Sequence, residues 1–332
     1  MVNLRGFVAR LTPKRRPRIG AAFKRARKPI IILLAICLST FAAYHAAIAW
    51  LGPPPLAAAR VSSKLVLDRN GQLLRPFTTE DGLWRLPVSL DEVDPRYISL
   101  LLNYEDKRFY EHGGVDARAL ARAVWQFIRY RRPVSGASTL TMQTARLLDD
   151  RPTRSYFAKI GQVFRAWQLE ATMSKREVLE LYMRLAPFGG NIEGVRAASL
   201  AYFGKEPRHL TVAEAALLVA LPQSPEQRRP DRDPAEADKA RDRVIDRAAD
   251  AGSISRAEAD FAKQQALRST RYNFPALAPH LAERLAASSG DDVLRLTIDA
   301  RLQEGAESVV ARHAENLGPR ISAPVLDRKS VV

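Results

Sequence analysis

A polar cluster between Tyr104 and Asp116 holds the residues with the most potential for chemistry. The cluster reads YEDKRFYEHGGVD and follows an apolar run from Ile98 to Leu102. A carboxylate at the edge of an apolar wall can have a raised pKa and act as a general base or acid near neutral pH. The alternative is a helix end whose charges are simply solvated, and composition alone favours that interpretation.

A second polar segment, residues 136–146, reads GASTLTMQTAR. It places hydroxyls, an amide and a guanidinium directly after a glycine, and such groups can hold a phosphate or a sugar. The alternative is a helix with Ser138 as its N-cap, because serine commonly caps helices. Further along, Lys159, Gln162 and Glu170 are on their own ordinary residues of a helix surface.

These polar residues fall in a region whose pattern is mostly helical, from Tyr97 to about Leu221. Residues 117–130 carry apolar side chains at helical spacing, which predicts an amphipathic helix. Four N-terminal capping signals predict further helix starts: Ser174–Glu177, Thr211–Glu214, Asp233–Pro234 and Ser255–Glu258. The helix that begins at Pro234 is expected to end at Gly252.

Strand signals flank this helical region. Residues 64–74 have two apolar runs around Asn70 and Gly71, which is a hairpin signal. Residues 293–297 predict a strand, after which Asp299 is placed to cap a helix that runs to about Ala314. A segment of roughly forty residues cannot bury much surface alone. We therefore expect residues 286–332 to be the truncated start of a further domain.

An uncharged apolar segment lies near the N-terminus. Residues 30–51 contain no Asp, Glu, Lys or Arg. As a helix this segment would be roughly 33 Å long, enough to cross a hydrocarbon core of about 30 Å. We predict a transmembrane helix at residues 29–51, with residues 1–28 as a basic cytoplasmic segment. A cleaved signal peptide is the alternative, but the apolar run is longer than the usual core of a signal peptide.

The composition excludes several classes of protein. The chain has 332 residues, of which 46% are hydrophobic and 27% charged, a balance typical of globular proteins. Cys37 is the only cysteine, which excludes an internal disulfide and any CxxC metal or redox site. The net charge is +16, but residues 1–28 hold ten Lys or Arg and no acid, so the other residues carry only +6. The body of the chain therefore need not bind nucleic acid.

The two polar segments resemble the motifs of a known family. EDKRFYEHGGVD resembles E-D-x-x-F-x-x-H-x-G-x-D, and GASTLTMQTAR resembles G-x-S-T-[IL]-T-x-Q-x-x-[KR]. Both patterns belong to glycosyltransferase family 51, the peptidoglycan polymerases. The segments SKREVLELYMRLAPFGG and AYFGKEPRHLTVAEAALLVALPQSP follow in the family's order. The runs RLAPFGG and PQSP look most like the 1C type of class A penicillin-binding protein, and VLRLTIDARLQ resembles the start of that class's transpeptidase domain.

This resemblance implies a fold and an activity. The fold would be mainly α, a lysozyme-like bi-lobed glycosyltransferase domain at residues 52–285 behind the transmembrane helix. The activity would be polymerisation of lipid II into β-1,4-linked glycan strands, with inversion at the donor's anomeric carbon and release of undecaprenyl diphosphate. The expected partners are lipid II, undecaprenyl-diphosphate-linked glycan and the bilayer, with cell-wall synthesis proteins as candidates and no nucleic acid. The catalytic domain would be periplasmic, anchored in the bacterial inner membrane.

The resemblance also implies roles for individual residues. Glu105 would be the general base for the acceptor's 4-hydroxyl group, and Lys159 would contact the pyrophosphate. Three residues would order the surroundings of the base: Asp106, His112 and Asp116. Four residues would line the groove for the sugar and phosphate: Ser138, Thr139, Gln143 and Arg146. A jaw that dips into the membrane would be formed by Arg118, Arg122, Trp125, Phe127 and Ile128.

The chain departs from the family's pattern at two positions. Gln162, which we count among the substrate-binding residues, stands where many members have a second glutamate. The resemblance allows a divalent cation there, but a neutral amide neither donates a proton readily nor holds a divalent metal strongly, so we assign no metal site. The usual Tyr-Leu-Asn reads Tyr182-Met183-Arg184. Loss of the asparagine is expected to loosen local packing or a polar contact.

Two other functions remain as alternatives. One is an inactive scaffold that binds lipid II or divisome proteins, which the intact motifs oppose. The other is a lytic hydrolase with the same fold. Transpeptidases of this class need a serine followed three residues later by lysine. No serine of the 332 residues has that spacing, and neither Lys-Thr-Gly nor Ser-x-Asn occurs. We therefore expect no transpeptidase activity in this chain.

Overall fold

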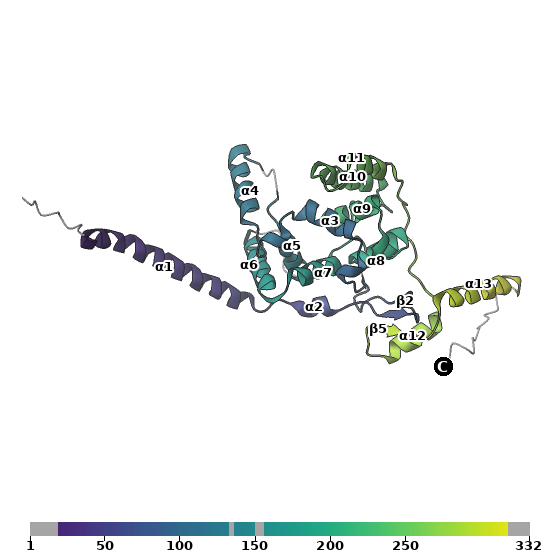
Figure 1. Ribbon diagram of the computed structural model, residues 1–332. Coiled ribbons are helices and arrows are strands. Elements are labelled where there is room, and N and C mark those ends of the chain that lie inside the picture. Colours follow the sequence, from purple (N-terminus) through teal and green to yellow (C-terminus); the bar gives the residue numbers. More distant parts are fainter. Residues whose placement is uncertain (1–18, 133–135, 150–155, 318–332) are drawn as a thin grey trace, which may run out of the picture. The chain divides into compact units, whose positions relative to one another are not determined.

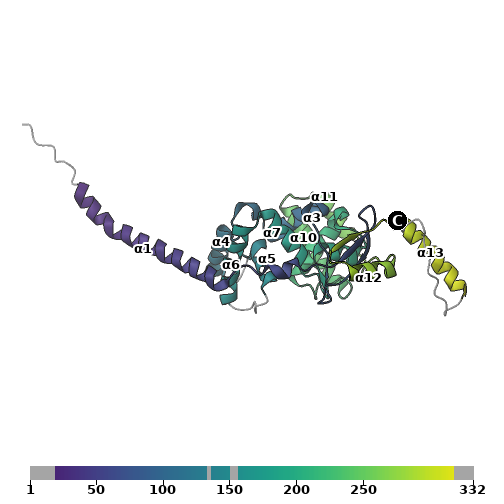
Figure 2. The same ribbon diagram turned by 90° about the horizontal axis from the view of Figure 1, so that it is seen from below.

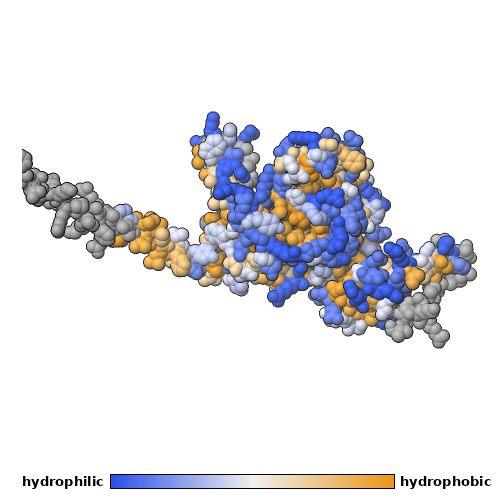
Figure 3. Space-filling view, in the orientation of Figure 1, coloured by the Kyte–Doolittle hydropathy of each residue, from blue (hydrophilic) through white to orange (hydrophobic). Residues whose placement is uncertain are grey.

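The computed structural model describes residues 19–132, 136–149 and 156–317. The chain divides into two compact units, residues 1–52 and 53–332. In the first unit, α1 (Ile19–Leu51) contains a 21-residue stretch, Ile31–Leu51, that is long and apolar enough to cross a membrane. Its apolar surface is visible in Figure 3. The helix thus includes the predicted span at residues 29–51 but begins earlier, within the basic segment, whose residues 1–18 lie outside the described residues.

The second unit is mainly helical, which confirms the predicted fold class (Figure 1). Its helices are α2 (Leu56–Arg60), α3 (Pro95–Glu105), α4 (Ala117–Tyr130), α5 (Leu140–Leu148), α6 (Tyr156–Thr172), α7 (Lys175–Leu185), α8 (Val195–Phe203), α9 (Val212–Ala220), α10 (Pro234–Asp250), α11 (Arg256–Gln264), α12 (Pro279–Ser288) and α13 (Ala300–Leu317). α9 is buried along nearly its whole length and packs against α3, α8, α10 and α11. A helix that is apolar on all sides must be covered on all sides, so α9 forms the centre of the main core.

The predicted capping signals all form. Ser174, Thr211 and Ser255 each accept a hydrogen bond from the backbone of a glutamate three residues later, whose carboxylate returns to the cap. Asp233 caps α10 ahead of Pro234. Each such cap contributes about 1 kcal/mol, which stabilises helices that are only about two and a half to five turns long. The helix starts in this region therefore follow from local sequence.

Two small sheets complete the second unit. β1 (Leu65–Leu67) pairs in antiparallel fashion with β2 (Leu73–Pro76), which confirms the predicted hairpin. β1 also pairs in parallel with β5 (Val293–Arg295), so the strand order is β2-β1-β5. β3 (Trp84–Arg85) and β4 (Ile192–Glu193) form a separate parallel pair. β2, β5 and α12 lie together at one end of this unit (Figures 1 and 2).

Asp68 ties the hairpin to the last described helix. The side chain is buried and accepts hydrogen bonds from the N–H groups of Asn70 at 2.7 Å, Gln72 at 2.8 Å and Ala300 at 3.1 Å. Burial opposes the charge, but these donors together lower the pKa of Asp68 below its ordinary value. The predicted domain start at residue 286 stays a prediction, and the structure places the strand that follows it against β1.

Candidate active site

Glu105 is the last residue of α3, and the core fixes that helix. Tyr97, Leu100 and Leu101 are buried on one face of α3. Asp94 caps the start of the helix by accepting a hydrogen bond from the N–H of Arg96 at 2.9 Å. The end of the helix therefore presents the Glu105 carboxylate at a defined position.

Two side-chain amides hold the Glu105 carboxylate, one on each oxygen. Gln143 of α5 donates its Nε2–H to Oε2 at 2.8 Å. Gln223, in the 3-10 turn Leu221–Gln223 that follows α9, donates its Nε2–H to Oε1 at 2.7 Å. Because each carboxylate oxygen has two lone pairs, one on each oxygen remains available to accept a proton from a substrate.

The carboxylate lines a cavity of about 210 Å³ together with other predicted site residues. Six of the ten predicted residues meet there: Glu105, Ser138, Gln143, Arg146, Lys159 and Gln162. Met142 and Gln223 complete the lining. The cavity is thus bordered by residues of α3, α5, α6, the loop before α5 and the turn after α9. Residues spread over more than a hundred positions of sequence converge on one small polar space.

Two cationic side chains give this cavity an anion-binding character. Lys159 donates its Nζ–H to Ser138 Oγ at 2.5 Å, and Arg146 lies close enough to influence it electrostatically. Partial burial of the ammonium group and the positive charge of Arg146 both lower the pKa of Lys159. A bound anion would relieve the repulsion between the two cations. A phosphate group is therefore well suited to this part of the cavity.

Asp106 and His112 lie behind Glu105 and join two segments. Both side chains are largely buried, and His112 Nε2 lies 3.0 Å from Asp106 Oδ1. Asp106 Oδ2 also accepts the N–H of Leu140, the first residue of α5, at 3.0 Å. A carboxylate at a helix N-terminus is favoured by the helix dipole, so Asp106 fixes α5 against the end of α3. The role of these two residues in ordering the surroundings of the base stays a prediction.

Asp116 orders the loop that leads into α4. It caps α4 by accepting the N–H of Ala119 at 2.9 Å, and it binds Arg108, whose Nη2 lies 2.6 Å from Oδ1. Burial opposes its charge, but the Ala119 N–H and the Arg108 guanidinium lower the pKa of Asp116 overall. Like Asp106 and His112, Asp116 is absent from the residues that line the cavity.

Thr139, rather than Ser138, is the N-cap of α5, so the interpretation of Ser138 as a cap is wrong. Thr139 Oγ1 accepts the N–H of Met142 at 3.1 Å and donates to the carbonyl of Gly114 at 2.6 Å. The hydroxyl is buried and does not line the cavity, in contrast to that of Ser138. Gly114 has a φ of +87°, and a Cβ there would lie 2.8 Å from the carbonyl oxygen of Ala166, so only glycine fits this contact.

Sequence reasoning missed several residues that support the site. Gln223 lies in the quoted PQSP run, but nothing in that run indicated a contact with Glu105. Glu170, an ordinary surface residue by sequence, accepts hydrogen bonds from Thr141 Oγ1 and Lys175 Nζ, both at 2.6 Å. At the second departure from the family pattern, Arg184 donates to the carbonyl of Ala59 at 3.3 Å, which links α7 to α2.

Two buried tyrosines lie in the electrostatic field of the site. Tyr97 and Tyr182 are almost completely buried, and Tyr97 Oη has no hydrogen-bond partner among the described residues. Burial first, and then the negative charge of Glu105, raise the pKa of both phenols. Both phenols therefore stay neutral near neutral pH.

The cavity does not have the donor set of a divalent-cation site. Glu105 is the one carboxylate among the described residues that line it, and Gln162 contributes a neutral amide. Across the described part of the chain, no group of three or more His, Cys, Asp or Glu side chains is arranged to hold a metal. Hard divalent cations prefer several oxygen ligands with negative charge among them. The residues present therefore do not fit such an ion.

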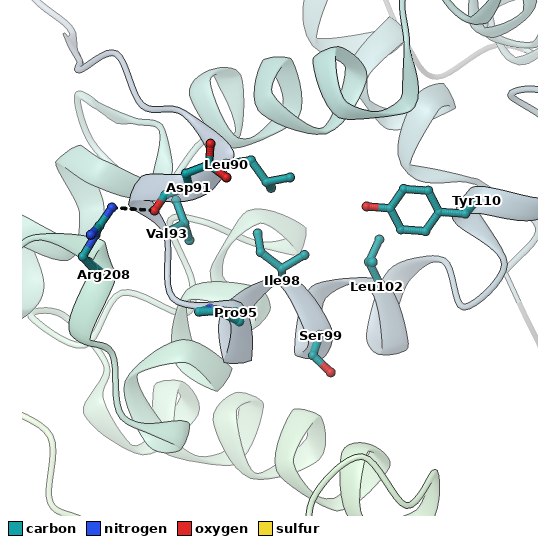
Figure 4. Close-up of a pocket in the computed structure, with 9 residues that line it drawn as sticks. All are labelled: Leu90, Asp91, Val93, Pro95, Ile98, Ser99, Leu102, Tyr110 and Arg208. Atoms are coloured by element: carbon teal, nitrogen blue, oxygen red, sulfur yellow. Dashed lines mark hydrogen bonds between the residues drawn. The ribbon is translucent and has the colours of Figure 1, made fainter.

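A larger hollow of about 770 Å³ lies beside α3 but has a different character (Figure 4). Its lining is mainly apolar, with Leu90, Ile98 and Leu102 directed toward the space and Tyr110 at one side. Its polar contact is a hydrogen bond from Arg208 Nη2 to the backbone carbonyl of Asp91 at 2.8 Å. Among its described lining residues, the Asp91 carboxylate is paired with Arg176 at 2.6 Å, and Arg208 is the one cation, with no lysine or second arginine beside it. We therefore assign the chemistry to the smaller cavity.

A model of the transglycosylase family matches residues 70–249, a range that includes every residue lining the small cavity. Penicillin-binding protein 1C of Escherichia coli (strain K12) is 42% identical over 264 residues, which is 80% of this chain and 34% of that protein. Penicillin-binding protein 1F of Bacillus subtilis (strain 168) is 37% identical over 206 residues, 62% of this chain and 28% of that protein.

A crystal structure of penicillin-binding protein 1A from Haemophilus influenzae also matches, with a TM-score of 0.37 and 20% identity over 82% of this chain and 33% of that one. The chain spans about a third of the length of the curated relatives it matches.

Proposed function

We propose that this chain, which belongs to the transglycosylase family, polymerises lipid II into β-1,4-linked glycan strands and releases undecaprenyl diphosphate. The observation that carries the proposal is the convergence of a held carboxylate and two cations in one small cavity. Glycosyl transfer from a diphosphate donor needs a base for the incoming hydroxyl and positive charge for the departing diphosphate. The described residues supply both.

Glu105 acts as the general base in this proposal. Its carboxylate accepts the proton of the acceptor's 4-hydroxyl as the oxygen attacks the donor's anomeric carbon. The bond from that carbon to the diphosphate oxygen breaks, and the pair of electrons leaves with the diphosphate. The amides of Gln143 and Gln223 restrain the carboxylate, which reduces the orientational cost of reaching the transition state.

Arg146, Lys159 and Ser138 bind the diphosphate in this proposal. Lys159 already donates to Ser138, so the two side chains form one polar surface that a phosphate oxygen can join. Charge on the leaving oxygen grows as the glycosidic bond breaks, and fixed cations stabilise that charge without reorganisation. Gln162 lines the same cavity as a neutral hydrogen-bonding group for the substrate.

The lining of the cavity argues for transfer rather than hydrolysis. Glycosidases generally use a pair of carboxylates that flank the scissile bond. Among the described residues that line this cavity, only Glu105 has a carboxylate. A diphosphate leaving group needs no acid to protonate it when cations stabilise its charge, so one carboxylate is sufficient for transfer from a diphosphate donor.

The membrane is the second partner in this proposal. α1 serves as a single-pass anchor of the bacterial inner membrane, and the ten basic residues of segment 1–28 favour a cytoplasmic N-terminus and a periplasmic second unit. α4 exposes a mixed surface of apolar and basic side chains, including Trp125, Ile128 and Arg122. Such a surface suits the interface of an anionic bilayer, where the lipid-linked substrate lies.

A direct assay tests this function. The full chain, reconstituted in lipid vesicles, is incubated with fluorescent lipid II, and the products are separated by gel electrophoresis. The proposal predicts a ladder of strands that lengthens with time. Unchanged lipid II would indicate a binding scaffold, and shortening of added preformed strands would indicate a hydrolase. Either result would overturn the proposed function.

A further inference from the structure

We propose that Gln223 is a positioning residue that holds the Glu105 carboxylate in its ionised, reactive orientation. The inference rests on the proposed function, because it assigns a further role in the same reaction. Gln223 comes from the turn after α9, whereas Gln143 comes from α5. The two amides reach the carboxylate from different elements and occupy both of its oxygens, at 2.7 and 2.8 Å.

Arg228 determines which way the Gln223 amide faces. Arg228 Nη1 donates to Gln223 Oε1 at 3.0 Å and to the carbonyl of Ala220 at 2.8 Å. A guanidinium has only donors, and an ionised carboxylate has only acceptors. The amide between them can satisfy both neighbours in one orientation alone, with its oxygen toward Arg228 and its N–H toward Glu105.

This arrangement forms a chain of hydrogen bonds from a fixed cation to the base. Arg228 is anchored at the C-terminal end of α9, the centre of the core, so the chain begins at a rigid point. An amide whose oxygen accepts a hydrogen bond from a cation is polarised, so its N–H donates a stronger hydrogen bond to an anion. Gln223 thereby transmits the influence of Arg228 to Glu105 without a direct ion pair that would block access to the carboxylate.

Other ionisable groups near Glu105 also act on its carboxylate. The effect of Gln223 is therefore measured by comparing its variants with wild type. These groups are Tyr97 on α3 itself, Tyr182 on α7, Arg146 on α5, Lys159 on α6, Arg228 after α9, and the neighbouring pair Asp106 and His112. All of these residues are still present when Gln223 is replaced, and Arg228 alone among them loses a hydrogen bond to it. Loss of its N–H removes one donor that favours the charged carboxylate.

The test compares Gln223→Met, Gln223→Glu and a matched control, Gln227→Ala, in the full chain. Met has a similar volume and no strong donor, and Glu replaces the donor with a second carboxylate. Gln227 is exposed in the same loop and its side chain makes no hydrogen bond among the described residues. Rates of lipid II polymerisation are measured over a range of pH to give kcat and KM.

The proposal predicts an ordered shift of the acid limb of the pH–rate profile. Gln223→Met moves the acid limb to higher pH by about half to one unit and lowers kcat about 3- to 10-fold, with KM nearly unchanged. Gln223→Glu moves it further, because adjacent carboxylates disfavour each other's ionisation. Gln227→Ala keeps the wild-type profile. A Gln223→Met enzyme with the wild-type acid limb would overturn the proposal.

A second measurement separates this proposal from the proposed function. The side-chain carboxyl of Glu105 is followed by ¹³C NMR in detergent micelles, with its signal identified by loss in Glu105→Gln. A titration midpoint at higher pH in Gln223→Met than in wild type supports the positioning role, even if the chain polymerises nothing. An equal midpoint contradicts it, whatever the outcome of the polymerisation assay.

Discussion

At the residue scale, the site combines one restrained carboxylate with two cations of different kinds. Arg146 carries a charge that persists at any accessible pH, whereas the pKa of Lys159 is lowered by partial burial and by Arg146 itself. In the proposed reaction the diphosphate needs both charges. Loss of the proton from Lys159 therefore limits activity at high pH.

Replacement of Lys159 tests that conclusion. Because the lowered pKa makes Lys159 neutral at lower pH than an ordinary lysine, wild-type activity should fall as pH rises through that value. Lys159→Arg should keep its charge and show an alkaline limb at higher pH. Lys159→Met should lose about 10- to 100-fold in kcat/KM near neutral pH, through loss of a charged hydrogen bond worth about 1.5–3 kcal/mol. An alkaline limb shared by wild type and Lys159→Arg would contradict this account. Lys239→Arg, on the exposed side of α10, is the control.

Gln162 leads to a prediction about metal dependence. Since the cavity offers one carboxylate and a neutral amide, polymerisation should change little when EDTA is added. Gln162→Glu places a second carboxylate in the lining and should make the rate depend more strongly on added Mg²⁺ or Mn²⁺. The check is the initial rate of strand formation with and without chelator. A strong loss of wild-type rate in EDTA would show that a metal acts here despite the donor set.

Single residues could be predicted where a motif names them, and not where only the fold brings them together. Six of the ten predicted residues line the cavity, of which four come from the two motifs, and Lys159 and Gln162 come from α6. Thr139 and Ser138 are adjacent hydroxyls, and sequence alone does not decide which one caps α5. Gln223 lies 118 positions from Glu105, so its contact depends entirely on the packing of α9 against α3.

At the element scale, α4 presents most of its apolar side chains to the surface. Among its described side chains only Ala119 is buried, and Trp125 is 60% exposed. The apolar spacing of residues 117–130 predicted the helix, and the structure places that apolar face at the surface. Exposed apolar groups with neighbouring arginines are stabilised by contact with a bilayer surface.

Quenching of Trp125 fluorescence tests whether α4 contacts lipid. In vesicles that contain brominated phospholipids, the lipid should quench part of the tryptophan fluorescence of the full chain. Replacement of Trp125 by Phe should remove part of that quenching. Trp84→Phe is the matched control, because Trp84 stacks on Phe274 with ring centroids 4.3 Å apart and should contribute little. Equal quenching in wild type and Trp125→Phe would place α4 away from the bilayer.

Helix starts were the most predictable elements because capping is local. The Ser-x-x-Glu and Thr-x-x-Glu patterns at residues 174, 211 and 255 contain both partners of the reciprocal hydrogen bonds. The start of α1 was less predictable. Basic residues do not break a helix, so α1 continues upstream of its apolar stretch to Ile19.

At the scale of the whole molecule, the pairing of β1 with β5 joins segments more than 220 residues apart. Each strand was predictable from its own apolar pattern, but their parallel pairing was not, because strand signals carry no information about partners. Asp68 makes the connection specific, since its carboxylate binds both the hairpin turn and the N–H of Ala300.

Removal of the Asp68 carboxylate should loosen this connection. Asp68→Ala leaves the buried N–H of Ala300 without its acceptor, and we expect a loss of about 1–3 kcal/mol in the free energy of unfolding, measured by thermal or denaturant melting. The folded-state pKa of Asp68 is lowered, so its contribution is present above the unfolded-state value and is lost as pH falls through the folded-state value. The stability difference between wild type and variant should therefore shrink in acid. A difference that stays constant with pH would exclude this role.

The measurement that tests the central claim most directly is the polymerisation of lipid II by wild type and Glu105→Gln in parallel. The amide keeps the size of the side chain but cannot take the acceptor's proton. We predict that wild type forms lengthening strands and that Glu105→Gln, with an unchanged melting temperature, is slower by about 10²- to 10⁴-fold. Strand formation by Glu105→Gln at nearly the wild-type rate would contradict the assignment of Glu105 as the base.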